Sequence, residues 1–188
     1  MITLGNAGDE RGTALASDAA GAVYLSTNFT GTIDADGGTG TLQLTTTGAS
    51  DVLLVKYTVS GAFGWADRLG GTDAEEATRA LAVIGTDVVV GLNVRGLADL
   101  DPGAGSATVA SLGGSDIAIA RYATATGALS GIPLRLGGTA NDAITALAAA
   151  AGGQLAVAGR YSGTIDLDSG AGVTALQSSA SGVIVESF

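Results

Sequence analysis

Paired aspartates in glycine-rich turns are the residues of this sequence best suited to chemistry. The turns read GTIDADGGTG at 31–40, GLADLDPGAG at 96–105 and GTIDLDSGAG at 163–172. Several carboxylates, in a turn that lets backbone carbonyls point inward, are what a hard cation such as Ca²⁺ requires. Zinc would need His or Cys, and the sequence contains neither. The spacing therefore indicates Ca²⁺ ligands, with the alternative that Asp and Gly are present only because both favour turns.

These turns belong to a repeat, because they begin 65 and 67 residues apart. LGN or LGG precedes each turn, at Leu4, Leu69 and Leu136, and a strand-like run follows it: SDVLLVKY, SDIAIARY and SGVIVESF. Self-similarity at a long, nearly fixed period indicates a repeat architecture whose units bury their apolar faces against one another. The repeats are 1–68 (with an N-terminal partial strand at 1–4), 69–135, and a truncated third unit at 136–188.

Each repeat reads as short strands bounded by Gly, Asp and Ser. In SDIAIARY, from Ser115, large and small residues alternate with the period of two that is typical of a strand. The Ala-rich segment 144–153 has helical propensity, but its counterparts in the other repeats contain β-branched residues or end after about eight residues, which is too short for a stable isolated helix. We therefore predict a strand there.

Four meandering strands per unit, with a hairpin extension at the outer edge, are the content of a β-propeller blade. The predicted fold class is all-β: three four-stranded antiparallel repeats of about 65 residues, forming part of a larger ring or array or completed by oligomerisation. A β-trefoil and a parallel β-helix both need shorter repeats. Three blades are too few for a closed ring, and only Ile2 to Leu4 could supply part of the strand missing after Phe188.

The repeat resembles the long bacterial β-propeller repeats of large secreted and cell-surface proteins. The resemblance lies in the GTIDxD turns, in GGSDIAIARY from Gly113 to Tyr122, and in the LGGT junctions at Leu69 and Leu136. It covers nearly the whole chain and implies an extracellular or cell-surface scaffold or adhesive array, usually without an assigned activity. The third unit departs from this pattern, since Gly182 stands where the others have Asp51 and Asp116.

The acids recur at matching places in the repeats. In an up-and-down meander, the start of the first strand, the end of the second and the start of the third lie at one edge of the sheet. We therefore expect the acids at these places to gather at that edge and to be the candidate Ca²⁺ ligands. They are Glu10, Asp34, Asp36, Asp51, Glu76, Asp99, Asp101, Asp116, Asp142, Asp166 and Asp168.

Composition excludes several other functions. The formal charge of −10 and pI near 4.1 would repel a phosphate backbone, so nucleic acid is not expected as a partner. The absence of His and Cys rules out Ser-His and Cys-His catalysis. No apolar run is long enough to span a bilayer, and MITLGN lacks the basic start of a signal peptide, so membrane insertion is not expected and an export signal would lie outside these residues.

Two other functions remain open on sequence grounds. Carboxylates could form a glycosidase pair, but acids that recur in every unit are more typical of a structural role than of a single catalytic centre. A lectin-like propeller, assembled as an oligomer, would use exposed aromatic residues to stack on sugars, and Phe29 and Tyr161 are the candidates. Both align with Val94, which favours apolar packing instead.

The sequence thus predicts a non-enzymatic extracellular module, structural or binding, built of propeller repeats. Its expected partners are further repeats of the same protein or other copies of itself, with glycan as a further candidate. No cofactor is expected other than Ca²⁺.

Overall fold

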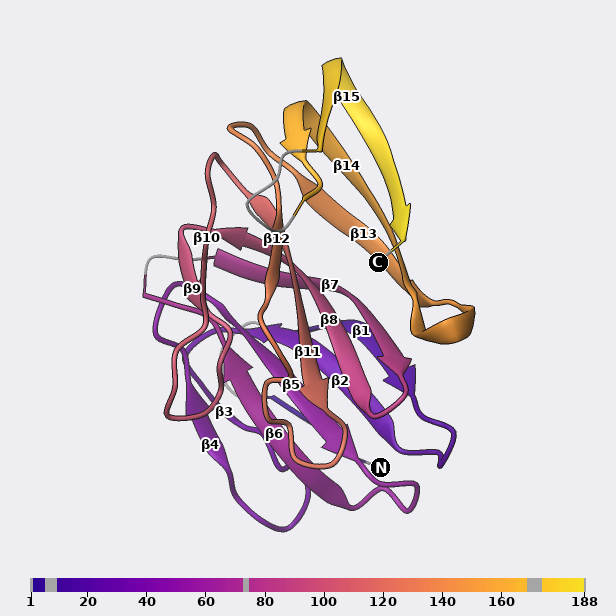
Figure 1. Ribbon diagram of the computed structural model, residues 1–188. Coiled ribbons are helices and arrows are strands. Elements are labelled where there is room, and N and C mark those ends of the chain that lie inside the picture. Colours follow the sequence, from indigo (N-terminus) through magenta and orange to yellow (C-terminus); the bar gives the residue numbers. More distant parts are fainter. Residues whose placement is uncertain (1, 6–9, 73–74, 169–173, 188) are drawn as a thin grey trace.

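The computed structural model describes residues 2–5, 10–72, 75–168 and 174–187 (Figure 1). In these residues the chain forms β-strands and one 3₁₀ turn, at Ala151–Gly153. No helix in the described residues is long and apolar enough to cross a membrane. The expected all-β class is therefore confirmed, and the Ala-rich segment 144–153 is a strand as far as Ala149, whereas the 3₁₀ turn occupies its end.

Three antiparallel sheets contain the main strands. The first has the order β1-β2-β5-β6, the second β12-β11-β8-β7, and the third β13-β14-β15. Their bounds are β1 Arg11–Ser17, β2 Val23–Phe29, β5 Asp51–Tyr57, β6 Phe63–Leu69, β7 Glu75–Ile84, β8 Asp87–Arg95, β11 Asp116–Ala123, β12 Leu134–Leu136, β13 Ala143–Ala149, β14 Leu155–Asp166 and β15 Ala175–Ser187. The first two sheets have the predicted four strands, and the third has three in the described residues.

A hairpin follows the second strand of each unit and folds back over one face of its own sheet. The first consists of β3 (Thr32–Asp34) and β4 (Gln43–Thr45), and the second of β9 (Leu97–Asp99) and β10 (Thr108–Ala110). In the third unit, β14 and β15 continue into the hairpin past a bulge between Tyr161 and Gly163. The prediction of an extension at the outer edge is wrong, because folding back buries apolar residues such as Ile33 against the sheet.

The face of a sheet that carries its own hairpin is called the front here, and the opposite face the back. In the first sheet, Leu53, Val55 and Tyr57 lie at the front, whereas Val52 and Leu54 lie at the back. This alternation along β5 follows from the period of two in a strand. Both faces of this strand are therefore buried.

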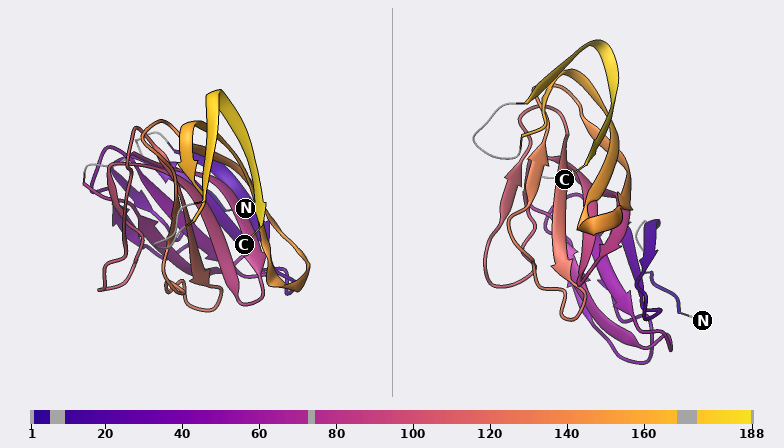
Figure 2. Two further views of the ribbon diagram at one scale, coloured as in Figure 1. Left: turned by 45° about the horizontal axis from the view of Figure 1, so that its top comes forward. Right: turned by 45° about the vertical axis from the view of Figure 1, so that its right-hand side comes forward.

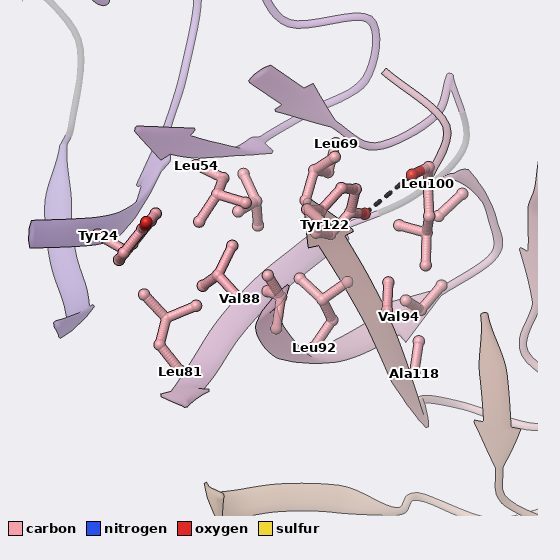
Figure 3. Close-up of a cluster of buried hydrophobic side chains, with 14 of the residues drawn as sticks. Tyr24, Leu54, Leu69, Leu81, Val88, Leu92, Val94, Leu100, Ala118 and Tyr122 are labelled. Carbon is pink, nitrogen blue, oxygen red and sulfur yellow. Dashed lines mark hydrogen bonds between the residues drawn. The ribbon is translucent and has the colours of Figure 1, made fainter. Parts of the chain in front are cut away.

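The three sheets stack face to face, as the views in Figures 1 and 2 show. The back of the first sheet packs on the front of the second, with the hairpin β9–β10 in the same core (Figure 3). Tyr122 is fully buried there, and its hydroxyl donates a 2.8 Å hydrogen bond to the carbonyl of Leu100 in this hairpin. The back of the second sheet packs in the same way on the front of the third.

The LGG junctions connect consecutive units by backbone pairing. Gly70 and Asp99 exchange two hydrogen bonds of 3.2 Å, which join the end of the first unit to the hairpin of the second. Asp166 donates its N–H to the carbonyl of Gly137 at the next junction. The same contact thus recurs one repeat later.

The N-terminal residues Ile2 and Leu4 lie against the first unit. A Cβ built on Gly37, in the turn of the first hairpin, would be 2.9 Å from Ile2 and 3.0 Å from Leu4. Leu4 also packs against the front core of the first sheet. In this structure these residues therefore contact the first unit, and their pairing with the third unit of another copy stays a prediction.

Candidate functional site

The first aspartate of each glycine-rich turn organises that turn. Its Oδ1 accepts the backbone N–H groups of the residues two and eight positions further along, with N···O distances between 2.9 and 3.2 Å. These aspartates are Asp34, Asp99 and Asp166. Because the carboxylate satisfies donors from both ends of the turn, it holds the hairpin tip closed.

The second aspartate of the turn supports the glycines after it. Asp36 Oδ1 accepts the N–H of Gly38 at 2.9 Å, and Asp101 Oδ1 accepts that of Gly103 at 2.8 Å. A Cβ built on Gly40 or Gly105 would collide with the carboxylate of its own turn. The spacing D-x-D-x-G is therefore explained by these close contacts between carboxylate and backbone.

The start of β1, the end of β2 and the start of β5 do lie at one edge of the first sheet, since Arg11 pairs with Asn28 and Phe29 with Asp51. The prediction is wrong, however, in placing the turn aspartates at this edge. The Tyr57 hydroxyl donates to the carbonyl of Asp36 at 3.2 Å, which places this turn at the end of β5 opposite to Asp51. A strand of this length separates the two ends by about 20 Å. The hairpin folds back over the sheet and carries its acidic tip away from the edge where it starts.

Two of the predicted acids are fully buried and paired with arginine. Asp51 Oδ2 accepts hydrogen bonds from the Thr47 N–H at 2.9 Å and from Arg68 Nη1 at 2.8 Å. In the second unit, Asp116 Oδ2 has the equivalent partners, the Leu112 N–H at 2.9 Å and Arg135 Nη1 at 3.5 Å. The motif that begins with Ser-Asp thus fixes the third strand to the fourth.

Asp116 is coupled to the next unit. Burial raises its pKa, an effect reduced by the Leu112 N–H, increased by the neighbouring carboxylate of Asp142 and reduced again by Arg135. Burial likewise raises the pKa of Asp142, against the hydrogen bonds it accepts from the N–H groups of Gly138 and Ser162.

In the described residues the third unit has neither the buried aspartate nor the fourth strand that carries the arginine in the other units. Gly182 faces Tyr161 across β14 and β15, at the register position where Asp51 faces Phe29. A Cβ on Gly182 would collide with the ring of Tyr161. The larger aromatic side chain and the missing carboxylate are therefore two parts of one change.

The remaining predicted ligands do not join these groups. Glu10 lines an apolar groove on the front of the first sheet, and the side chain of Glu76 lies outside the described residues. Among the residues that the structure describes, no three acidic side chains converge on a common point where a metal ion could bind. Binding of Ca²⁺ by the acids named above stays a prediction.

A polar groove of about 270 Å³ lies where the first unit meets the second hairpin, and we call it the junction groove. Its charged lining residues are Asp67 and Arg68 of β6 together with Asp99 and Asp101. Burial raises the pKa of Asp67 to about 7, and its Oδ2 has no hydrogen-bond partner in the described part of the chain. Sequence analysis missed Asp67, which lies outside the repeated motifs.

The charge of Asp99 is well supported in this groove. Burial tends to raise its pKa, but the N–H groups of Ala107 and Asp101, the Ser106 hydroxyl and the charge of Arg68 bring it below its usual value. Arg68 therefore forms an ion pair with the buried Asp51 of its own unit, and its charge also stabilises ionised Asp99 in the turn of the next unit. At this junction, acids of two consecutive repeats, Asp67 and the pair Asp99 and Asp101, thus line one groove together with Arg68.

The two aromatic residues considered for sugar stacking lie in the cores. Phe29 is fully buried and Tyr161 is 7% exposed. Neither can present a ring face to a glycan, so this assignment is wrong, and the alternative of apolar packing is correct. Their side chains point to the front of the sheet, where the folded-back hairpin covers them.

Comparison with models of known protein families and with curated proteins found no match for this chain.

Proposed function

We propose that this chain is a non-enzymatic structural and binding module of an extracellular or cell-surface protein, built of β-propeller-type repeats. The observation that carries the proposal is the recurrence of one contact at both junctions, where Gly70 pairs with Asp99 and Gly137 with Asp166. A contact repeated at each step is typical of an architecture that extends by adding equivalent units.

The roles of the aspartates support the same proposal. In all three turns the first carboxylate binds backbone N–H groups, and in two units a buried carboxylate binds arginine. These interactions stabilise the path of the chain from unit to unit. Acids used alike in successive units serve the scaffold, whereas catalysis needs a single asymmetric group of residues.

The expected location rests on the resemblance of the repeat to those of secreted and surface proteins. It is tested by treating intact producing cells with a protease and identifying the released peptides by mass spectrometry. We expect peptides of this chain to appear before those of a cytosolic marker protein. Release only after lysis would refute an extracellular module.

The dependence of each unit on its neighbours can be tested separately. A Cβ on Gly138 would collide with the carbonyl of Thr164 at the second junction. The change Gly138→Ala should therefore lower the urea midpoint reported by the fluorescence of Trp65, which lies in the first unit, whereas Thr139→Ala at an exposed neighbour should not. A fluorescence transition of Trp65 that is the same in wild type and Gly138→Ala would contradict the proposal.

A further inference from the structure

The front of the first sheet bears an apolar groove of about 350 Å³. It lies beside the N-terminal residues, and Leu15 at its side is 67% exposed. The lining residues are Ile2, Leu4, Glu10, Gly12, Leu15, Val23, Leu25, Thr27 and Tyr57. A soluble domain rarely leaves such a surface without a partner.

The same positions are covered in the other two units. Leu15 faces Leu25 across β1 and β2, just as Leu81 faces Val90 across β7 and β8. Leu81 is only 8% exposed, because the back of the first sheet packs on it. The groove is therefore the surface that contacts a preceding sheet in this stack, and in the first unit no sheet formed by the described residues covers it.

The back of the third sheet is the complementary open surface. Ala82 on the back of the second sheet is 6% exposed under the third sheet, whereas its register equivalent in the third sheet, Ala148, is exposed. Figure 2 shows no further sheet beyond β13–β15, so this back lies at one end of the stack.

At one position in the stack, large front residues of the third sheet fit against a glycine on the back of the second. A Cβ on Gly91, on the back of the second sheet, would be 2.6 Å from Ile144 Cδ1 and 3.1 Å from Leu147 Cδ1 of the third. On the third sheet, Ala158 takes the place of Gly91, and on the first sheet Leu15 takes the place of Leu147. At this position the two open surfaces thus have the same large-to-small relation as the contact between the second and third sheets.

We propose that the front of the first sheet of one copy packs on the back of the third sheet of a second copy. This inference rests on the proposed repeat module and names its partner. The occupant is a second copy because this chain itself carries both surfaces, in the register that its two internal interfaces already use. Such a head-to-tail contact closes into a ring or continues into a longer assembly.

The register also shows which polar residues this pairing would bring together. Within the stack, Asn93 Oδ1 on the back of the second sheet accepts the N–H of Ile144 on the third at 2.9 Å. By register, Arg160 occupies the position of Asn93 in the third sheet, and Gly12 occupies that of Ile144 in the first. The proposed contact therefore brings Arg160 to the segment that begins with Glu10 and Arg11, one acidic and one basic residue.

The test is the mass of the full chain and its variants by sedimentation velocity over a range of concentrations. We expect wild type to assemble, and both Leu15→Lys on the front and Ala148→Lys on the back to raise the dissociation constant about tenfold or more. Leu112 is 59% exposed away from both surfaces, so Leu112→Lys serves as the matched control that still assembles.

Mixing distinguishes a front-to-back contact from a symmetric one. The Leu15→Lys variant keeps its back and the Ala148→Lys variant keeps its front, so an equimolar mixture should form heterodimers although neither variant assembles alone. Assembly of Ala148→Lys alone, as expected for a front-to-front dimer, would overturn the proposal. So would a monomeric wild type at every concentration, which would assign the groove to a different protein segment.

Disulfide cross-linking is an independent test of the same contact. The chain has no native cysteine, so any disulfide must form between introduced cysteines. A mixture of Leu15→Cys and Ala148→Cys chains should form a disulfide-linked pair on oxidation, whereas Leu15→Cys alone should not. Equal cross-linking of Leu15→Cys alone would overturn the proposal. Both variants lie at exposed positions, and unchanged melting followed at Trp65 checks their folding. Detection inside cells would refute the surface module and leave this assembly intact, so the two failures are distinguishable.

Discussion

Replacing Asp67 by Asn should stabilise the protein above neutral pH. Asp67 lies on β6 in the junction groove, against Trp65 and Gly127, since a Cβ on Gly127 would collide with Asp67 Oδ2 and lie 2.9 Å from the Trp65 ring. Burial raises the pKa of this carboxyl from 3.8 to about 7. The folded protein therefore holds the proton more tightly than the unfolded chain does.

The sign of the pH dependence follows from this difference. Between pH 4 and 7 the unfolded carboxyl is ionised while the folded one stays protonated, so the free energy of unfolding falls as pH rises through this range and is lowest above pH 7. A shift of this size corresponds to about 4 kcal/mol as an upper limit. Because the side chain is partly open to the groove, solvent screening reduces the expected effect to about 1–2 kcal/mol.

Asn has the same shape as Asp and no charge. Asp67→Asn should therefore raise the free energy of unfolding by about 1–2 kcal/mol at pH 8, or the melting temperature by roughly 2–8 °C. Most of that difference should be lost when the pH is lowered to about 3.5, where the carboxyl is largely protonated in both states. Urea titrations followed by the fluorescence of Trp65, the single tryptophan, measure both values. A gain of equal size at the two pH values, or a loss at pH 8, would refute the reasoning that burial of the charge is the cause.

Three further substitutions test the internal interactions by urea denaturation at pH 7. Arg68→Met leaves the buried Asp51 without its arginine partner at 2.8 Å and should lower the free energy of unfolding by about 2 kcal/mol. Arg135→Met removes the longer contact of 3.5 Å with Asp116 and should lower it by about 1 kcal/mol. The reverse order of the two losses would argue against a role for these ion pairs. Asp99→Ala removes the acceptor of two backbone N–H groups and should lower the free energy of unfolding by about 2 kcal/mol, whereas Asp99→Asn keeps an acceptor and should lower it less. Equal losses would mean that the charge of Asp99, and not its hydrogen bonds, stabilises the turn. Gly91→Ala should cost about 1–3 kcal/mol through the contact with Ile144, and a neutral result would show that the interface between the second and third sheets is looser than described.

The sequence predicted the strands well because their signal is local. The alternation in β11, the apolar run in β5, positive-φ glycines such as Gly21 and Gly61 in tight turns, and the register of the repeats are all properties of neighbouring residues. The repeat also settled the strand at Ala143–Ala149, where propensity alone favours a helix.

The position of the hairpins could not be predicted in the same way. Whether Ile33 lies at an outer edge or returns over the sheet depends on contacts with Leu53 and Val55, twenty residues later in the chain. The expected place of the turn aspartates was wrong for this reason, since the folded hairpin moves Asp36 to the opposite end of β5. The burial of Asp67 could not be predicted from the sequence, because it comes from the loop at Gly127 in the following unit.

The pairing of each junction with the next hairpin also favours folding of the units in order, from the N-terminus to the C-terminus, during synthesis. Domains fold from the N-terminus as the chain leaves the ribosome. When the first sheet is complete, the edge at Gly70 and the back face beside it are already formed, and they provide a template for the strand at Leu97–Asp99 as soon as it emerges. Each newly synthesised unit thus docks on a unit that has already folded. Its apolar face is therefore exposed to water only briefly.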